Sequence, residues 1–331
     1  MKRYIKTTLN PDAYHGAGQK PPFFEGWYFK IADCSAKQTF AIIPGVFFSK
    51  KSAESHAFVQ ILDGKTGAVS YCEYPLNDFK ASDGVFEVQL GKNRFAANKA
   101  TLDIEQNGVS ISGELSFQNI TLWPVTLASP GIMGWYAWAP FMECFHGVVS
   151  LDHSISGSLN YNGKEISFDG GRGYIEKDWG RSFPGAWVWL QSNHFSQTGT
   201  SLTASIAIIP WLRGSFLGYI AGLWHEGVLH RFTTYTGAKV DHLEIKGKDV
   251  AMTLSNKTHI LEIGATRTSG GLLQAPSVDG MDRQILETIG STVEMHFKTR
   301  DGKTIFQGVG ENGGLEVEGD LERLMEMWRK S

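Results

Sequence analysis

Two carboxylates two residues apart form the most reactive pattern in this 331-residue sequence. Glu176 and Asp178 stand in Gly-Arg-Gly-Tyr-Ile-Glu-Lys-Asp-Trp-Gly, and on a β-strand they would share one face while Lys177 points to the other. Two carboxyls on one face raise each other's pKa, and an apolar wall that includes Tyr174 and Trp179 would raise it further. A carboxyl that stays protonated near neutral pH is a general acid.

The same spacing also suits a structural role. Glu176 and Asp178 could form salt bridges with Lys177, Arg172 or Arg181 in a linker between domains. The position of the stretch, between two sequence repeats described below, favours the chemical interpretation, because ligand sites often lie at domain interfaces. We expect a pocket between the repeats to which this stretch supplies the acid.

Another acid stands among aromatic residues near the N-terminus, in Phe-Phe-Glu-Gly-Trp-Tyr-Phe at residues 23–29. A buried acid in such surroundings needs a partner. Glu25 is therefore either a satisfied structural acid or, with Trp27 and Tyr28, part of the same pocket.

A third polar and aromatic pattern follows the acid pair. Trp187, Trp189, Gln191 and Asn193 alternate, so one strand face would carry two indoles and two amides. That face could bind a ligand or fill the interior of a barrel.

Composition excludes several classes of function. Lys and Arg number 31 against 34 acids, the net charge is −3, and no run of like charge occurs, so we expect no nucleic-acid partner. The histidines show neither HExxH spacing nor a tight cluster, which predicts no metal site. Gly171-Arg172-Gly173 lacks the Lys-Ser/Thr of a phosphate loop, and we expect no nucleotide cofactor.

The expected location is the cytoplasm. Cys34, Cys72 and Cys144 form no CxxC pair, and the basic N-terminus has no apolar segment behind it. A rim of aromatic residues could still touch a membrane surface at its periphery; its members are Trp135, Tyr136, Trp138 and Phe141.

Short strands with tight turns predict an all-β fold. β-branched and aromatic runs recur from Phe23 onward at close spacing, and Asn107-Gly108 is a hairpin signal. The predicted strands include Phe40–Phe48, Ala57–Leu62 and Ile120–Val125. A helix is predicted at 320–330, where Asp320 can cap it and an apolar stripe has helical spacing.

Four short echoes in the same order indicate an internal duplication. They are Ala41–Pro44 with Ala207–Pro210, Phe24–Trp27 with Phe183–Trp187, Ser112–Leu115 with Ser269–Leu272, and Asn162–Ile166 with Asp301–Ile305. We therefore predict an extended arm at 1–22, a β domain at 23–177 and a second β domain at 178–331. Each has enough strands for an antiparallel barrel or sandwich.

Three motifs resemble the signature of the tocopherol cyclase family: Tyr14-His15, residues 23–29, and Tyr174-x-Glu176-Lys177-Asp178-Trp179-Gly180-x-x-Phe183-Pro184-x-x-Trp187-x-Trp189-x-Gln191-x-Asn193. The resemblance runs in order across nearly the whole chain. It implies a tandem of lipocalin-like β units, related to carotenoid hydratases. The implied activity is a cofactor-free cyclisation of a prenylated hydroquinone, or a related terpenoid cyclisation or hydration, and a lipocalin-like carrier is the alternative.

The resemblance also implies roles. Glu176 would protonate the prenyl alkene; Asp178, where the plant enzymes have Asn, would tune it; and Lys177 would hold an acid or the phenol oxygen. The remaining implied residues would bind the hydrophobic substrate, with indoles facing the cation; they are Glu25, Trp27, Tyr28, Tyr174, Trp179, Trp187, Trp189, Gln191 and Asn193.

Overall fold

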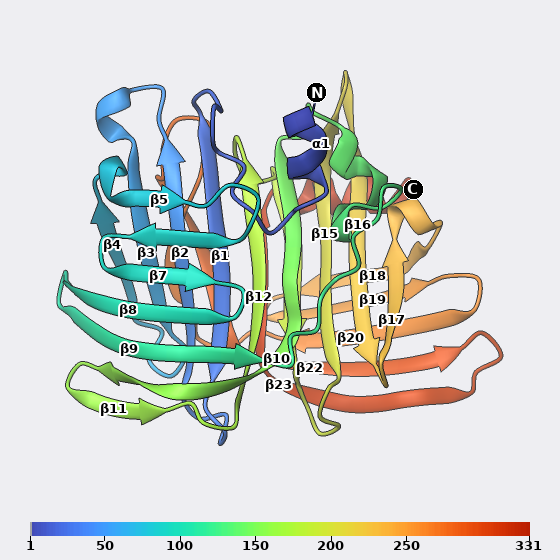
Figure 1. Cartoon of the computed structure of the whole chain (residues 1–331). Coiled ribbons are helices and arrows are strands. Elements are labelled where there is room, and N and C mark those ends of the chain that lie inside the picture. The colour runs from blue at the N-terminus through green and yellow to red at the C-terminus, as the bar shows by residue number, and fades with distance from the viewer. Residues whose placement is uncertain (1) are drawn as a thin grey trace. The chain divides into compact units, whose positions relative to one another are not determined.

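A computed structural model describes residues 2–331, and most of the chain is antiparallel β-sheet (Figure 1). Contacts divide it into two compact units. The first comprises Met1–Phe183 and Leu272–Gln284, and the second comprises Pro184–Gly271 and Ile285–Ser331. This division falls a little after the predicted boundary at residue 177, and it assigns a short segment of the C-terminal half to the first unit.

The first unit contains a twelve-stranded sheet in the order β4-β3-β2-β1-β12-β10-β9-β8-β7-β6-β5, with β11 paired to β10. In Figure 1, β7, β8 and β9 cross in front of β1 to β4, so the sheet curls around its core. The strands are β1 (Phe23–Ala32), β2 (Thr39–Phe48), β3 (His56–Asp63), β4 (Val69–Tyr74), β5 (Phe79–Ala81), β6 (Glu87–Leu90), β7 (Asn93–Ala96), β8 (Lys99–Gln106), β9 (Val109–Gln118), β10 (Cys144–Tyr161), β11 (Lys164–Ser167) and β12 (Gly171–Gly180).

The second unit contains an eleven-stranded sheet whose main path is β17-β16-β15-β13-β23-β22-β20-β19-β18. Its strands are β13 (Ala186–Ser192), β14 (His194–Phe195), β15 (Ser201–Trp211), β16 (Gly214–His225), β17 (Val228–Thr233), β18 (Lys239–Lys246), β19 (Asp249–Ser255), β20 (His259–Thr266), β22 (Arg283–Thr299) and β23 (Thr304–Gly319). Gly271–Ala275 forms β21, and short 3-10 helices are η1 (Ser52–Glu54), η2 (Leu76–Asp78), η3 (Gly131–Trp138) and η4 (Thr234–Thr236).

The two sheets share one strand order, which supports the duplication. β4-β3-β2-β1-β12-β10 of the first corresponds to β17-β16-β15-β13-β23-β22 of the second. Ala41–Pro44 and Ala207–Pro210 lie in the corresponding strands β2 and β15, and the Asn-Gly and Asp-Gly echoes follow β10 and β22. Ser112–Leu115 lies inside β9 whereas its echo begins after β20, so that match does not fall on corresponding elements.

The core of each unit forms from one face of its strands, as period-two alternation requires. Trp27, Phe29 and Ile31 of β1 lie in the first core, and Val188 and Leu190 of β13 lie in the second. The all-β, lipocalin-like fold is thus confirmed.

The C-terminal helix is also confirmed. α2 spans Leu321–Arg329, Asp320 accepts a hydrogen bond from the backbone N–H of Arg323, and Leu324 is buried. Across residues 2–331, no helix combines the length and apolar character that a bilayer span needs.

Two local predictions differ from the structure. Residues 2–8 form helix α1 (Lys2–Thr8) instead of an extended arm, and the Tyr4 hydroxyl donates to the carbonyl of Trp138, a tertiary contact that stabilises so short a helix. Ile120–Val125 is not a strand. Asn119 has a left-handed φ of 55° that turns the chain there, and Pro124 lacks the N–H that a ladder needs.

Candidate functional site

The acid pair lies in β12, in the middle of the first sheet, between β1 and β10. Glu176 pairs with Tyr28 of β1 and with Val148 of β10, and Asp178 pairs with Gly26 and His146. Because opposite residues of antiparallel strands share a face, both acids point to the face opposite the apolar core. The stretch is therefore a central strand and not a flexible linker.

A histidine lies between the two carboxylates. Nδ1 of His146 is 3.0 Å from Oδ1 of Asp178, and Nε2 is 3.6 Å from Oε2 of Glu176. The hydroxyl of Tyr174 donates to the same Glu176 oxygen at 2.6 Å. Glu176 is buried, whereas the side chain of Asp178 is 28% exposed, so the cluster opens on the Asp178 side.

The charges around His146 favour its protonated form. Burial lowers the pKa of this imidazole, but Asp178 and Glu176, with the hydrogen bond to Asp178, outweigh burial and raise its pKa to about 9. At neutral pH His146 is thus protonated, with Asp178 at one ring nitrogen and Glu176 near the other.

The three side chains could in principle hold a metal ion, because one ligand atom from each lies within 4.8 Å of the others. The orientation of the three side chains favours a proton shared between His146 and the acids over a metal ion. Each ring nitrogen of His146 points to a different carboxylate, whereas a shared metal would need one nitrogen and both carboxylates to converge on one point.

Lys177 points to the other face of β12, as predicted, and pairs with Glu25. Its Nζ lies 2.6 Å from Oε1 of Glu25, and both side chains are fully buried. Nζ also donates to the carbonyls of Pro11, at 3.1 Å, and of Ala13. The ion pair therefore fastens residues 11–13 to the sheet.

Glu25 is a satisfied buried acid. The backbone N–H groups of His15 and Gly16 donate to its carboxylate at 2.9 Å. Burial raises the pKa of Glu25, but Lys177 and His15 outweigh burial and hold the pKa below its ordinary value. This environment matches the structural interpretation of Glu25.

Trp27 and Trp179 surround the ammonium of Lys177, whose Nζ lies 4.8 Å and 4.6 Å from their ring centroids. His15 stacks on Trp179 at 4.3 Å. The sequence predicts that Trp179 lines the apolar side of the acid pair. Trp179 instead lies on the opposite face of β12, because it is an odd number of residues from Glu176.

The remaining predicted residues lie in the second unit, on β13 and just after it. Trp187, Trp189 and Gln191 are buried on the face opposite Val188 and Leu190, so the indoles do not fill the apolar core. Nε1 of Trp187 donates to Oε2 of Glu316 at 2.6 Å. Gln191 is fully buried, and neither amide atom has a hydrogen-bond partner within residues 2–331. Asn193 is also fully buried.

His146 is the residue that sequence reasoning missed. It lies 30 residues before Glu176 and outside every motif, and only the pairing of β10 with β12 brings it to the acids. That pairing shifts register between Val148 and Ser150 and again before His153, so no fixed spacing could have predicted it.

Comparison with known proteins identifies the family. The sequence profile described as tocopherol cyclase-like matches residues 102–319. The chain belongs to the tocopherol cyclase-like family.

The relatives of this tocopherol cyclase-like chain include plant enzymes. A chloroplastic tocopherol cyclase of Zea mays is 25% identical over 320 residues, which cover 80% of this chain and 67% of the relative. A second chloroplastic relative, from Oryza sativa subsp. japonica, is 25% identical over 92% of this chain and 77% of its own length. CghA in complex with Sch210972 has the same fold, with a TM-score of 0.58, 14% identity, and coverage of 91% of this chain and 89% of CghA.

Proposed function

We propose that this protein closes a chromanol ring in a prenylated hydroquinone, or performs a closely related terpenoid cyclisation or hydration. Family membership and the plant relatives support a cyclase, and a hydrophobic small molecule is the substrate class. The observation that supports it most is the position of His146 between Glu176 and Asp178, with Nε2 3.6 Å from Oε2 of Glu176 and Nδ1 3.0 Å from Oδ1 of Asp178.

The reaction requires a proton donor and a dry environment. A proton adds to the CH carbon of the trisubstituted alkene and leaves a tertiary cation at the neighbouring carbon. The phenol oxygen then attacks that carbon, the ring closes, and the phenol proton is released, so the overall change is an isomerisation. Water would capture the cation and give a tertiary alcohol.

The cluster can supply this proton through Glu176. His146 stores a proton next to the acid, and a shortening of the 3.6 Å separation would pass it from Nε2 to Oε2. Asp178 holds the other ring nitrogen and so orients the imidazole. The phenol proton returns to the same group after closure. The proposed reaction steps are redox-neutral and need no cofactor.

We also propose a peripheral contact with membranes, from which a prenylated substrate can be taken. Leu127, Trp135 and Phe141 are 70%, 47% and 43% exposed, and the neighbouring helix α1 carries Lys2 and Arg3, together with Lys6, which pairs with Asp83 at 2.9 Å. Aromatic rings beside basic residues suit the headgroup region of an anionic bilayer. The three free thiols of Cys34, Cys72 and Cys144 fit the proposed cytoplasmic location.

The test is turnover of a prenylated hydroquinone by wild type and by Glu176→Gln. We expect chromanol in the first case and a loss of about 10² or more in the second, which is the scale of a general acid. Binding should be retained. Equal turnover would remove Glu176 as the acid, and binding without turnover by either protein would favour the alternative, a lipocalin-like carrier.

A further inference from the structure

The acid face of the first sheet contains a side-chain-free position beside the cluster. Asp178 pairs with Gly26, Gly26 pairs with Gly45, and Gly45 pairs with Phe58. All four positions therefore share one face, and two glycines separate the acid from the phenyl ring.

Glycine occupies these two positions for different reasons. At Gly45 an added Cβ would lie 2.4 Å from Cζ of Phe58, so the ring already fills that space. At Gly26 an added Cβ would meet only Cγ2 of Ile43 at 3.7 Å and the carbonyl oxygen of Pro44 at 3.8 Å, which are ordinary contacts. Packing therefore does not require glycine at position 26.

Backbone geometry does not require it either. Gly26 is not among the residues with positive φ, and the pairing of β1 with β12 runs through it without a bulge. Glycine inside a strand costs stability, and where no bulge or bend explains it, it often marks the close approach of a ligand.

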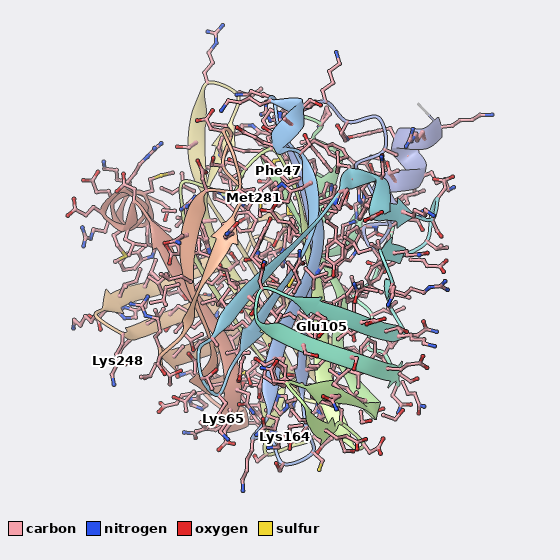
Figure 2. All side chains as sticks on the ribbon, turned by 90° about the vertical axis from the view of Figure 1, so that its left-hand side faces the viewer. Phe47, Lys65, Glu105, Lys164, Lys248 and Met281 are labelled. Carbon is pink, nitrogen blue, oxygen red and sulfur yellow. The ribbon has the colours of Figure 1, made fainter. Side chains whose placement is uncertain are left out.

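The far side of this position is apolar. Phe24, Phe47 and Phe58 form a buried cluster separate from the main core. Met281 packs against this cluster, and Figure 2 labels Met281 beside Phe47. Met281 belongs to Leu272–Gln284, the segment that joins the first unit from late in the chain.

Hydrogen bonds fasten this segment over the sheet. The side-chain amide of Gln60 in β3 donates to the carbonyl of Gln274 at 2.8 Å, and its oxygen accepts from the N–H of the same residue at 2.8 Å. The segment thus supports the aromatic cluster from outside.

We propose that Gly26 is the floor of a subsite for an acyclic isoprenoid chain, with the Glu176–His146–Asp178 cluster on one side and the Phe24, Phe47 and Phe58 cluster on the other. Phe24 and Tyr28 lie two residues away on β1 and share the face of Gly26, and neighbouring strands are about 4.8 Å apart, so the gap over Gly26 is one residue long and takes a single branch or bend of the chain. The placement of the alkene beside the acid rests on the proposed function. The binding of an apolar chain over Gly26 does not depend on that function.

The experiment compares Gly26→Val with Gly264→Val. Gly264 is a matched control, because it lies inside strand β20 of the second unit and an added Cβ would meet only Glu294 atoms at 3.8 and 3.9 Å. Geranylgeraniol, which has four isoprene units and no phenol, is the probe, and tryptophan fluorescence reports its binding. We expect binding at least about tenfold weaker in Gly26→Val, the scale of a small change in an apolar pocket, and unchanged in Gly264→Val.

Gly26→Ala should give a smaller loss in the same assay, and circular dichroism establishes that each variant is folded. The subsite is overturned if wild type does not bind geranylgeraniol or if Gly26→Val binds it as tightly as wild type does. It is also overturned if Gly264→Val weakens binding as much as Gly26→Val. Turnover is a separate readout. If wild type binds the probe through Gly26 but converts no prenylated hydroquinone, the proposed function fails and the subsite stands.

Discussion

Lys177→Met tests whether the Lys177–Glu25 pair is structural. The substitution keeps an apolar stem of similar length but removes the one lysine or arginine that lies within salt-bridge distance of Glu25 among residues 2–331. It also leaves the carbonyls of Pro11 and Ala13 without the Nζ donor. Breaking one partner of a fully buried pair costs about 3–5 kcal/mol.

For a unit of this size each kcal/mol lowers Tm by about 2–4 °C, so we expect a fall of roughly 6–20 °C. Urea and thermal unfolding followed by circular dichroism measure it. Lys99→Met is the control in the same unit, because Lys99 and Glu114 lie 2.7 Å apart but are 47% and 54% exposed. Its expected effect is below about 1 kcal/mol. An unchanged Lys177→Met stability with lost turnover would refute the structural assignment and make Lys177 catalytic.

Two further predictions concern His146 and the membrane rim. The pKa of His146 rises from 6.5 to about 9 on folding. Its protonation therefore contributes about 3 kcal/mol to the free energy of unfolding, and this contribution is complete below pH 6.5 and is lost as the pH rises through 9. The stability difference between wild type and His146→Gln should shrink over that range, and Asp178→Asn should move the loss to lower pH; a difference independent of pH contradicts this. Trp135→Ala with Phe141→Ala should reduce sedimentation with anionic vesicles severalfold, since both rings are exposed. Unchanged sedimentation of the double variant would show that the aromatic rim does not contact the membrane.

Local patterns predicted much of the fold. Alternation placed Lys177 opposite Glu176 and Asp178, and Asn107-Gly108 forms the turn between β8 and β9 with φ values of 53° and 79°. These features depend only on neighbouring residues. Helix α1 was missed because its stability depends on the distant contact between Tyr4 and Trp138.

The site was less predictable than the fold, because its partners come from other strands. His146 reaches Asp178 only through a bulged pairing, and Glu25 reaches Lys177 only because β1 lies beside β12. Trp179 and Glu176 are close in sequence, yet strand alternation separates them onto opposite faces. Proximity along the chain therefore identified the right strand but not the right neighbours.

The most direct measurement is turnover of a prenylated hydroquinone in D2O, with the product analysed by mass spectrometry and NMR. Protonation of the alkene by the Glu176 cluster predicts one deuterium on a single face of the carbon that was the alkene CH, and Glu176→Gln should slow its appearance by about 10² or more. Chromanol without deuterium at that carbon, or deuterium delivered equally fast by Glu176→Gln, would contradict the proposal that Glu176 donates the proton.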